Sequence, residues 1–348
     1  MRARTLVVAP NWLGDCLMAQ PLLTLLKARA PAGDIDVLAP PAVAPLLRRM
    51  PEISEVLEVD WRHGNLDLRE RWRMGRRLRG RYAHAFVLPN SWKSALVPFF
   101  ADVPLRVGYS GESRHGLINV RHANPKKGSE RTPMARFYAQ LGESPGKVPP
   151  ERLPDPVLRA DPVAAIAIKS SFGLAPGAAL VVLCPGAEYG PAKRWPAEHF
   201  GALAGQLAAR GAVPVVLGTQ KEVPLGLAVE QFSLGRALNL AGRTSLDDAI
   251  NLIAGSALVV SNDSGLMHVA AALGRPLVAL YGSSSPRHTP PLSPAARVIY
   301  RALDCSPCYA RECPLGHLRC LREITPAEVL EQCESLLADP AAGQRAAV

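Results

Sequence analysis

The 348-residue sequence lacks the features that mark several large protein classes. It has no apolar run near the roughly 18 residues that span a bilayer. Its first residues, MRARTLVVAP, are basic and then apolar, but the apolar segment ends before Asn11 and is too short for a secretory leader. Neither the G-x-G-x-x-G pattern of nicotinamide enzymes nor the G-x-x-x-x-G-K-[ST] pattern of P-loop NTPases occurs. A D-x-D at Asp34 and Asp36 leads into an expected strand and is interpreted as incidental. These absences favour a cytoplasmic protein of another class.

Acidic residues are scarce relative to basic ones, but only in the first half. Residues 1–160 hold 25 Lys and Arg against 15 Asp and Glu, whereas residues 161–348 hold 15 of each, so the first half carries the whole formal charge of +10. This excess indicates an anionic partner, which is nucleic acid, a membrane surface or a phosphorylated substrate. Seven arginines form the densest run, with Trp72 among them: Arg69, Arg71, Arg73, Arg76, Arg77, Arg79 and Arg81. On a helix they would spread around most of the circumference, so a merely solvated helix stays equally open.

Seven cysteines in a cytoplasmic chain are expected to be reduced thiols. Three are isolated and expected to be buried: Cys16, Cys184 and Cys333. The other four are clustered, with His317 between the last two: Cys305, Cys308, Cys313 and Cys320. Their spacing is compatible with a structural metal site and equally with a stiff, thiol-lined loop, so both interpretations stay open.

Apolar segments alternate with helical stretches along the chain. The segments that predict strands are residues 5–9, 35–38, 56–59, 85–88, 180–184, 213–217, 258–261 and 277–281. Such alternation is typical of parallel sheets covered on both faces. A Pro-rich, charged stretch at residues 142–162 predicts a linker. We therefore expect an α/β chain of two doubly wound, Rossmann-like domains, residues 1–160 and 161–348, facing each other across a cleft with ligands at the carboxyl ends of the strands.

Small polar residues follow two of the expected strands. Asn262-Asp263-Ser264-Gly265 opens a helix, where Ser264 can cap and Gly265 lets a phosphate approach free backbone N–H groups. The turn at residues 281–286, Tyr-Gly-Ser-Ser-Ser-Pro, ends the next strand. Two such turns side by side favour an anion site, although an ordinary capped helix stays open.

A third segment, residues 185–196, follows the strand at 180–184 and ends in Lys-Arg-Trp-Pro. Pro196 is expected in the first turn of a helix, which leaves Lys193 and Arg194 in a loop over the strand ends. Two cations there can neutralise a leaving diphosphate. An ordinary solvated loop is the alternative.

Four segments, in this order, resemble the ADP-heptose:lipopolysaccharide heptosyltransferases, most closely the branch that adds the second heptose. They are residues 11–15 (NWLGD), 185–196, 261–268 (SNDSGLMH) and 305–317 (CSPCYARECPLGH). The resemblance spans nearly the whole chain. It implies a GT-B type glycosyltransferase whose first half receives the lipid acceptor and whose second half holds the sugar nucleotide. It also implies that the helical stretch at residues 326–337 crosses back onto the first domain.

The resemblance assigns the two catalytic roles. It implies that Asp15 is the base of an inverting transfer, although from the residues alone a helix N-cap is the commoner use of such an aspartate. Gly14 would permit a tight turn there. Lys193 would stabilise the leaving diphosphate in place of a metal, so that neither a metal nor a cofactor is required for catalysis.

The resemblance also implies the binding residues. On the donor side these are Lys193, Asn239, Asp263, Ser264, Gly265 and His268, whereas Glu188 and Tyr189 are doubtful diphosphate contacts. On the acceptor side they are Asn11, Trp12, Gly14, Ser91, Lys93 and Arg106. Arg114 and Arg121 are weaker candidates, for which ordinary surface charge is the favoured interpretation.

The expected reaction moves L-glycero-D-manno-heptose from ADP-heptose onto the first heptose of heptosyl-Kdo2-lipid A. The enzyme would lie in the cytoplasm, peripheral at the inner leaflet of the inner membrane, and would bind no nucleic acid. Three alternatives remain: the sister enzyme that adds the first heptose to Kdo, a GT-B-like sugar-nucleotide epimerase, and a nucleic-acid-binding protein. The last is disfavoured because the basic half lacks regular aromatic interleaving.

Overall fold

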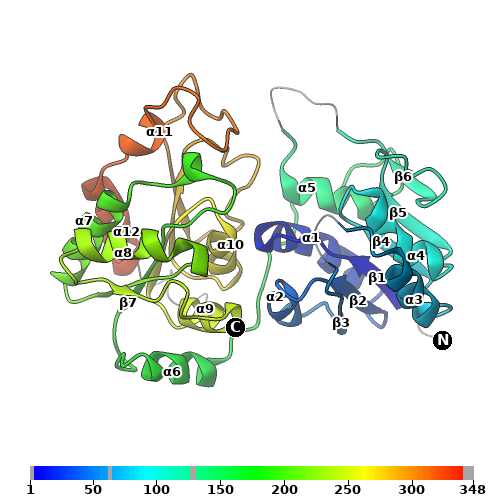
Figure 1. Cartoon of the computed structure of the whole chain (residues 1–348), viewed down its shortest axis with the longest axis horizontal. Helices are drawn as coiled ribbons and strands as arrows, with labels where there is room; N and C mark the ends of the chain where they lie inside the picture. The colour runs from blue at the N-terminus through cyan, green and yellow to red at the C-terminus, as the bar shows by residue number, and fades with distance from the viewer. Residues whose placement is uncertain (1–3, 62–64, 126–130, 340–348) are drawn as a thin grey trace. The chain divides into compact units, whose positions relative to one another are not determined.

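The computed structural model describes residues 4–61, 65–125 and 131–339. The chain divides into two compact units, Met1–Asp155 and Pro156–Val348, and each is a parallel sheet flanked by helices (Figure 1). No helix within the described residues is long and apolar enough to cross a bilayer.

The first unit is built on a six-stranded sheet with the order β3-β2-β1-β4-β5-β6, all parallel. Its strands are β1 (Arg4–Val8), β2 (Asp34–Ala39), β3 (Glu55–Glu58), β4 (His84–Val87), β5 (Leu105–Tyr109) and β6 (Val120–His122). Its helices are α1 (Leu13–Arg29), α2 (Ala44–Arg48), α3 (Leu68–Leu78), α4 (Leu96–Phe100) and α5 (Met134–Ala139), with 3-10 turns η1 (Trp92–Ala95) and η2 (Gln140–Gly142). The strand order reverses between β1 and β4, which is where ligands bind in such sheets.

The second unit has a parallel sheet of the order β12-β11-β10-β7-β8-β9. Its strands are β7 (Leu180–Cys184), β8 (Val213–Val216), β9 (Leu238–Asn239), β10 (Leu258–Asn262), β11 (Leu277–Tyr281) and β12 (Ala296–Tyr300). Its helices are α6 (Pro162–Ser171), α7 (Ala197–Ala208), α8 (Val223–Phe232), α9 (Leu246–Ala254), α10 (Gly265–Ala272), α11 (Arg319–Arg322) and α12 (Pro326–Ala338), with η3 (Pro191–Lys193) and η4 (Gln220–Glu222). Counted from its own first strand, each unit has the order 3-2-1-4-5-6, so the switch point here lies between β7 and β10.

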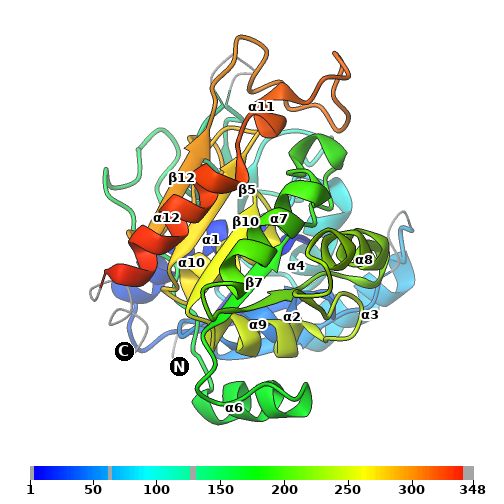
Figure 2. The ribbon, with the colours of Figure 1, turned by 90° about the vertical axis from the view of Figure 1, so that its left-hand side faces the viewer.

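Helices cover both faces of the second sheet. In Figures 1 and 2, α7, α8 and α12 lie on one side of it and α10 lies on the other. The strand β7 is accordingly buried along its whole length, which explains its unbroken apolar sequence LVVLC. Val329 and Cys333 place the inner face of α12 in the core of this unit, beside Trp195 and Phe200. The stretch expected to cross back onto the first domain therefore has its apolar face occupied within the second unit.

The eight predicted strands are confirmed. Four of them differ from the observed strands by one residue at both ends, and two differ by one residue at one end. Residues 180–184 and 277–281 match β7 and β11. The strands β5, β6, β9 and β12 were not predicted. Two of them, β6 and β9, are only three and two residues long, and charged or exposed residues such as Arg106 and Arg297 interrupt the apolar pattern of the other two.

Candidate active site

A buried ion pair lies at the carboxyl end of the second sheet. Lys193 ends η3 after β7, and Asp263 directly follows β10, the neighbouring strand. The Nζ of Lys193 lies 2.6 Å from Oδ2 of Asp263, and the side chains are only 16% and 4% exposed. Thr289 donates a hydrogen bond to the same oxygen at 3.2 Å. Electrostatic interactions are stronger where water is excluded, so this pair can bind the phosphate and hydroxyl groups of a ligand.

Asn262 holds the loop that carries Lys193. Its Oδ1 accepts from the backbone N–H of Trp195 at 3.0 Å, and its Nδ2 donates to the carbonyl of Pro185 at 2.7 Å. Both ends of the 185–196 loop are thus fixed to a fully buried side chain. The sequence places Asn262 in a motif but gives it no role, because its two partners lie more than 60 residues away.

The start of α10 completes this end of the sheet. Ser264 occupies the N-cap position as predicted, yet its hydroxyl makes no capping bond and instead lies 3.1 Å from Oγ of Ser261. Gly265 is the first helical residue. His268 is buried, and desolvation lowers its pKa to about 4, a shift that Asp263 opposes and Lys193 reinforces. The imidazole is therefore neutral at pH 7.

The turn after β11 lies on the neighbouring strand, as the sequence predicts. Ser283 and Ser284 are buried, and within the described residues neither hydroxyl has a hydrogen-bond partner. Buried hydroxyls are usually paired, so these two are available to a ligand, and Ser283 lines a pocket together with Cys305 and Cys308.

Asn239 lies away from the Lys193–Asp263 pair, whereas the ring centre of Tyr189, a doubtful contact in the sequence, lies 5.3 Å from Nζ of Lys193. Asn239 is in β9, an edge strand separated from β10 by β8 and β7, and its Oδ1 accepts from the N–H of Ala241 at 3.0 Å. Glu188 accepts from the exposed Lys221 at 3.1 Å. Tyr189 donates to the carbonyl of Tyr309 at 2.7 Å. The structure thus groups Lys193 with Asp263 and His268, and leaves Asn239 apart.

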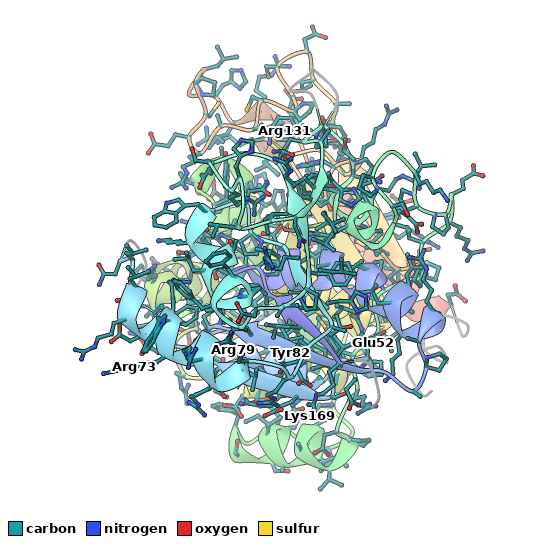
Figure 3. All side chains as sticks on the ribbon, turned by 90° about the vertical axis from the view of Figure 1, so that its right-hand side faces the viewer. Glu52, Arg73, Arg79, Tyr82, Arg131 and Lys169 are labelled. Atoms are coloured by element: carbon teal, nitrogen blue, oxygen red, sulfur yellow. The ribbon has the colours of Figure 1, made fainter. Side chains whose placement is uncertain are left out.

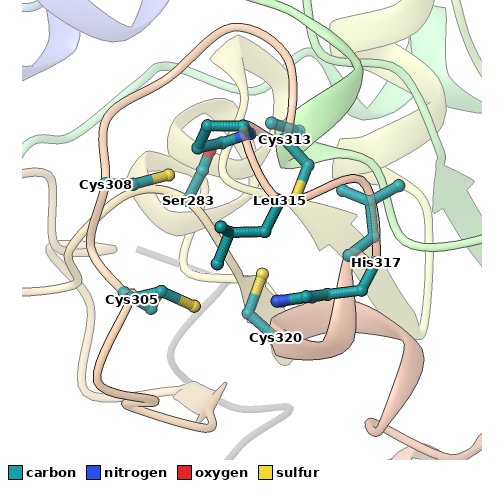
Figure 4. A pocket seen from close by; sticks show the side chains of 11 residues that line it. Ser283, Cys305, Cys308, Cys313, Leu315, His317 and Cys320 are labelled. Carbon is teal, nitrogen blue, oxygen red and sulfur yellow. The ribbon is translucent and has the colours of Figure 1, made fainter.

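The clustered cysteines line a small pocket together with His317 and Leu315 (Figure 4). Backbone N–H groups, that of Leu318 first, lower the pKa of Cys313, whereas burial raises the pKa of Cys320 to about 11. Among the residues that the structure describes, no three His, Cys, Asp or Glu side chains are arranged to hold a metal ion. A structural metal therefore stays a prediction. The three isolated cysteines are free and buried, as predicted.

The cysteine loop also supports the lysine loop. The carbonyl of Arg311 accepts from the N–H of Ala192 at 3.0 Å, immediately before Lys193. Gly190 lies against the backbone of Arg311, where a Cβ would collide with it. This close approach explains the glycine and fixes the path of the chain toward Lys193.

In the first unit, Asp15 lies in the first turn of α1. The N-cap position is taken by Trp12, so Asp15 is not the cap that residue type alone suggests. Its Oδ1 accepts a hydrogen bond from the Tyr138 hydroxyl at 3.1 Å. Gly14 is the second residue of α1, so its backbone is helical and does not form the expected tight turn. Trp12 is 55% exposed.

A pocket of about 100 Å³ lies at the carboxyl ends of β1, β2 and β4. It brings together three predicted acceptor residues: Asn11, Ser91 and Lys93. Its lining also includes Arg71, Trp61 and Ser94. The sequence names Arg71 only as one of the seven clustered arginines and gives Trp61 no role.

Arg71 is a charged residue in the lining of this pocket, and it is only 6% exposed. Its guanidinium lies 4.0 Å above the Trp61 ring, and it donates to the carbonyls of Leu66 at 2.8 Å and Lys93 at 3.0 Å. Burial lowers its pKa, but an arginine stays charged. Arg71 is the only buried arginine of α3. It lies four and seven residues before Gly75 and Leu78, and this helical spacing is the signal in the sequence that separates it from the neighbouring arginines.

Two arginine predictions need correction. Arg106 is the second residue of β5, near the amino end of that strand, and its guanidinium donates to the carbonyls of Val103 and Leu117 at 2.7 Å each. It braces a loop at the end of the sheet opposite the pocket, because residue 106 precedes the strand's carboxyl end at Tyr109. Arg114, expected on the surface, is 1% exposed and donates to the carbonyl of Pro89 at 2.9 Å.

Comparisons with known proteins agree with this geometry. The family model described as "Glycosyltransferase family 9 (heptosyltransferase)" matches residues 71–319. The lipopolysaccharide heptosyltransferase 2 of Salmonella typhimurium is 44% identical, over 97% of this chain and 99% of its own. The lipopolysaccharide heptosyltransferase 1 of Pseudomonas aeruginosa is 25% identical, over 97% and 99%.

The solved structure of the Escherichia coli ADP-heptose lps heptosyltransferase II superposes with a TM-score of 0.84 at 42% identity, covering 97% of this chain and 98% of that one. The two doubly wound units are thus those of a GT-B type fold. The chain belongs to glycosyltransferase family 9, the heptosyltransferases.

Proposed function

We propose that this enzyme transfers L-glycero-D-manno-heptose from ADP-heptose to the first heptose of heptosyl-Kdo2-lipid A. The observation that carries the proposal is the 44% identity to a lipopolysaccharide heptosyltransferase 2 over nearly the full chain. The buried Lys193–Asp263 pair at the switch point of the second sheet supports a sugar-nucleotide site there. The lower identity to a heptosyltransferase 1 favours the second heptose over the first.

The proposed chemistry is an inverting substitution at the anomeric carbon. The acceptor hydroxyl attacks that carbon from the face opposite the diphosphate, and its proton passes to Asp15 as the bond from carbon to the ADP oxygen breaks. The Tyr138 hydroxyl donates a hydrogen bond to Oδ1 of Asp15, which fixes the orientation of the carboxylate that takes the proton.

On the donor side, Lys193 stabilises the negative charge that develops on the departing ADP, which is the role we propose for it in place of a metal ion. Asp263 accepts hydrogen bonds from heptose hydroxyls, and the N–H groups at Ser264 and Gly265 bind the diphosphate. Because His268 is neutral, it can donate or accept a hydrogen bond there without adding charge. Asn239 is proposed to meet the nucleoside.

On the acceptor side, the pocket of Asn11, Ser91, Lys93 and Arg71 receives the acidic inner-core sugars and their phosphates. Trp12 offers an exposed ring on which a sugar can stack. We propose that the enzyme acts in the cytoplasm, peripheral at the inner membrane, where such a lipid acceptor is anchored.

The test is a choice between acceptors. Purified enzyme receives ADP-heptose with either Kdo2-lipid A or its mono-heptosylated form, and both ADP release and the mass of the lipid are measured. We expect one added heptose only on the mono-heptosylated lipid. Addition only to Kdo2-lipid A would assign the first heptose instead, and conversion of ADP-heptose without any acceptor would indicate an epimerase.

A further inference from the structure

Helix α3 has two faces of different character. Its inner face holds Arg71, Gly75 and Leu78, all buried. Gly75 lies against Phe100 of α4 so closely that a Cβ would collide with it, so the helix is held tightly on the body of the first unit. Arg71 reaches from this face into the wall of the acceptor pocket.

The outer face of α3, defined here as Leu68, Arg69, Trp72, Arg73, Arg76 and Arg77, is exposed throughout. Leu68 and Trp72 are four residues apart, so they are neighbours on one side of the helix, and they are 47% and 50% exposed. Figure 3 shows Arg73 pointing away from the molecule.

The arginines of this face are poorly neutralised. Arg73 has Glu70 as an ion-pair partner at 3.9 Å. For Arg69, Arg76 and Arg77, the described residues provide neither a side-chain hydrogen bond nor an ion pair. A merely solvated helix usually mixes both signs of charge, whereas this one has a single acidic residue between its ends.

This combination fits an anionic lipid surface better than a nucleic acid. Arginines attract lipid phosphates, while an adjacent tryptophan and leucine insert at the level of the headgroups. A nucleic-acid face would instead offer repeated aromatic rings for stacking, and α3 exposes only one.

We propose that the outer face of α3 docks on the anionic surface of the membrane that holds the acceptor. The same helix then joins the membrane to the acceptor pocket, because Arg71 lies on its inner face. A sugar chain anchored in that membrane would thereby meet Arg71 and Lys93 close to the lipid surface. This inference rests on the proposed function only for the identity of the acceptor.

The first test is binding to lipid vesicles. Full-length protein is sedimented with vesicles of phosphatidylcholine, with or without about one third phosphatidylglycerol, at low and high salt. We expect binding only to the anionic vesicles, weakened by salt. Replacing Arg69, Arg76 and Arg77 by glutamine should weaken binding at least tenfold, and Trp72→Ala should weaken it severalfold.

A charge-matched control shows whether the position of the arginines on α3, rather than the net charge of the protein, determines vesicle binding. Arg236, Arg297 and Arg322 are exposed arginines of the second unit, and their triple replacement by glutamine removes the same charge. We expect this control to bind vesicles like the wild type. Equal binding by the α3 triple variant, equal loss in the control, or wild-type binding to neutral vesicles would overturn the proposal, as would preference for duplex DNA over the anionic vesicles.

Transfer to a de-acylated, soluble acceptor distinguishes a failure of docking from a failure of the proposed function. The α3 triple variant should keep wild-type transfer to this acceptor, because none of its three arginines lines the pocket. It should lose transfer to the same acceptor embedded in vesicles by about the factor by which binding falls. If the wild type binds anionic vesicles but transfers heptose to neither acceptor, the docking surface stands and the proposed function fails.

Discussion

The hydroxyl of Tyr138 donates a hydrogen bond to Oδ1 of Asp15 at 3.1 Å, across 123 positions of the sequence. Burial and the neighbouring carboxylate raise the pKa of Tyr138 well above its usual value, so the hydroxyl remains a donor through the whole range of a transfer assay. The pair joins α5 to the first turn of α1 and orients the carboxylate that we propose as the base.

Tyr138→Phe should therefore slow catalysis without removing it. We expect kcat to fall about tenfold with little change in the KM for ADP-heptose, because only the orientation of Asp15 is lost. Tyr82→Phe is the matched control, since Tyr82 donates to the buried Asp36 at 2.7 Å in the same unit. That control should lower stability but keep kcat, and a similar loss of kcat in both variants would argue against a role for Tyr138.

Lys193→Met should affect both activity and stability. Removing the cation takes away the charge that stabilises leaving ADP, so transfer should fall by about 10² or more. It also leaves the 4% exposed Asp263 without its ion-pair partner, which should cost about 3 kcal/mol of unfolding free energy in urea.

Adding Asp263→Asn to Lys193→Met tests whether the unpaired carboxylate of Asp263 causes the loss of stability. The double variant should regain most of the lost stability, because the buried charge is gone, while transfer stays low. Lys221→Met, which breaks the exposed pair with Glu188, is the control and should change stability by less than about 1 kcal/mol. No recovery in the double variant would show that Lys193 stabilises the fold in another way.

The stability of the enzyme should fall in acid because of His268. Its folded pKa is about 4, below the ordinary 6.5, so between these values the unfolded chain binds a proton that the folded chain does not. The neutral His268 therefore does not lower the free energy of unfolding above pH 6.5. As the pH falls from 6.5 toward 4, the free energy of unfolding decreases by up to about 1.4 kcal/mol per pH unit. In urea unfolding, His268→Gln should have a flatter pH dependence than the wild type. Equal slopes would contradict the buried, neutral histidine.

Arg71→Lys should weaken acceptor binding although it keeps the charge. A lysine cannot hold the carbonyls of Leu66 and Lys93 together while stacking on Trp61. We expect the KM for the acceptor to rise about tenfold with an unchanged KM for ADP-heptose. Arg69→Lys, on the outer face of the same helix, should leave both values unchanged with a soluble acceptor.

The sequence predicts the architecture well because the central strands of both sheets are parallel and largely buried. Segments such as LVVLC at β7 are apolar on both faces, and that pattern needs no knowledge of distant partners. The edge strands β6 and β9 escape prediction because so few residues take part in them.

The sequence predicts some site residues and misses others, according to whether a local pattern marks them. Lys193 and Asp263 can be expected together because each follows one of two neighbouring strands. Arg106 is misplaced because residue type does not reveal at which end of its strand it lies, and Arg114 because a buried arginine satisfied by carbonyls looks like any surface arginine in the sequence. Tyr138 and Asn262 act through partners far along the chain, so no local pattern marks them.

The most direct measurement of the central claim is heptose transfer by Asp15→Asn, with ADP-heptose binding measured on the same preparation. Asparagine keeps the shape of the side chain and can still accept the Tyr138 hydrogen bond, but it cannot take a proton from the acceptor. We predict that transfer to mono-heptosylated Kdo2-lipid A falls by about 10² to 10⁴ while the Kd for ADP-heptose is unchanged. Near-normal turnover by this variant would contradict the account and remove Asp15 from the role of base.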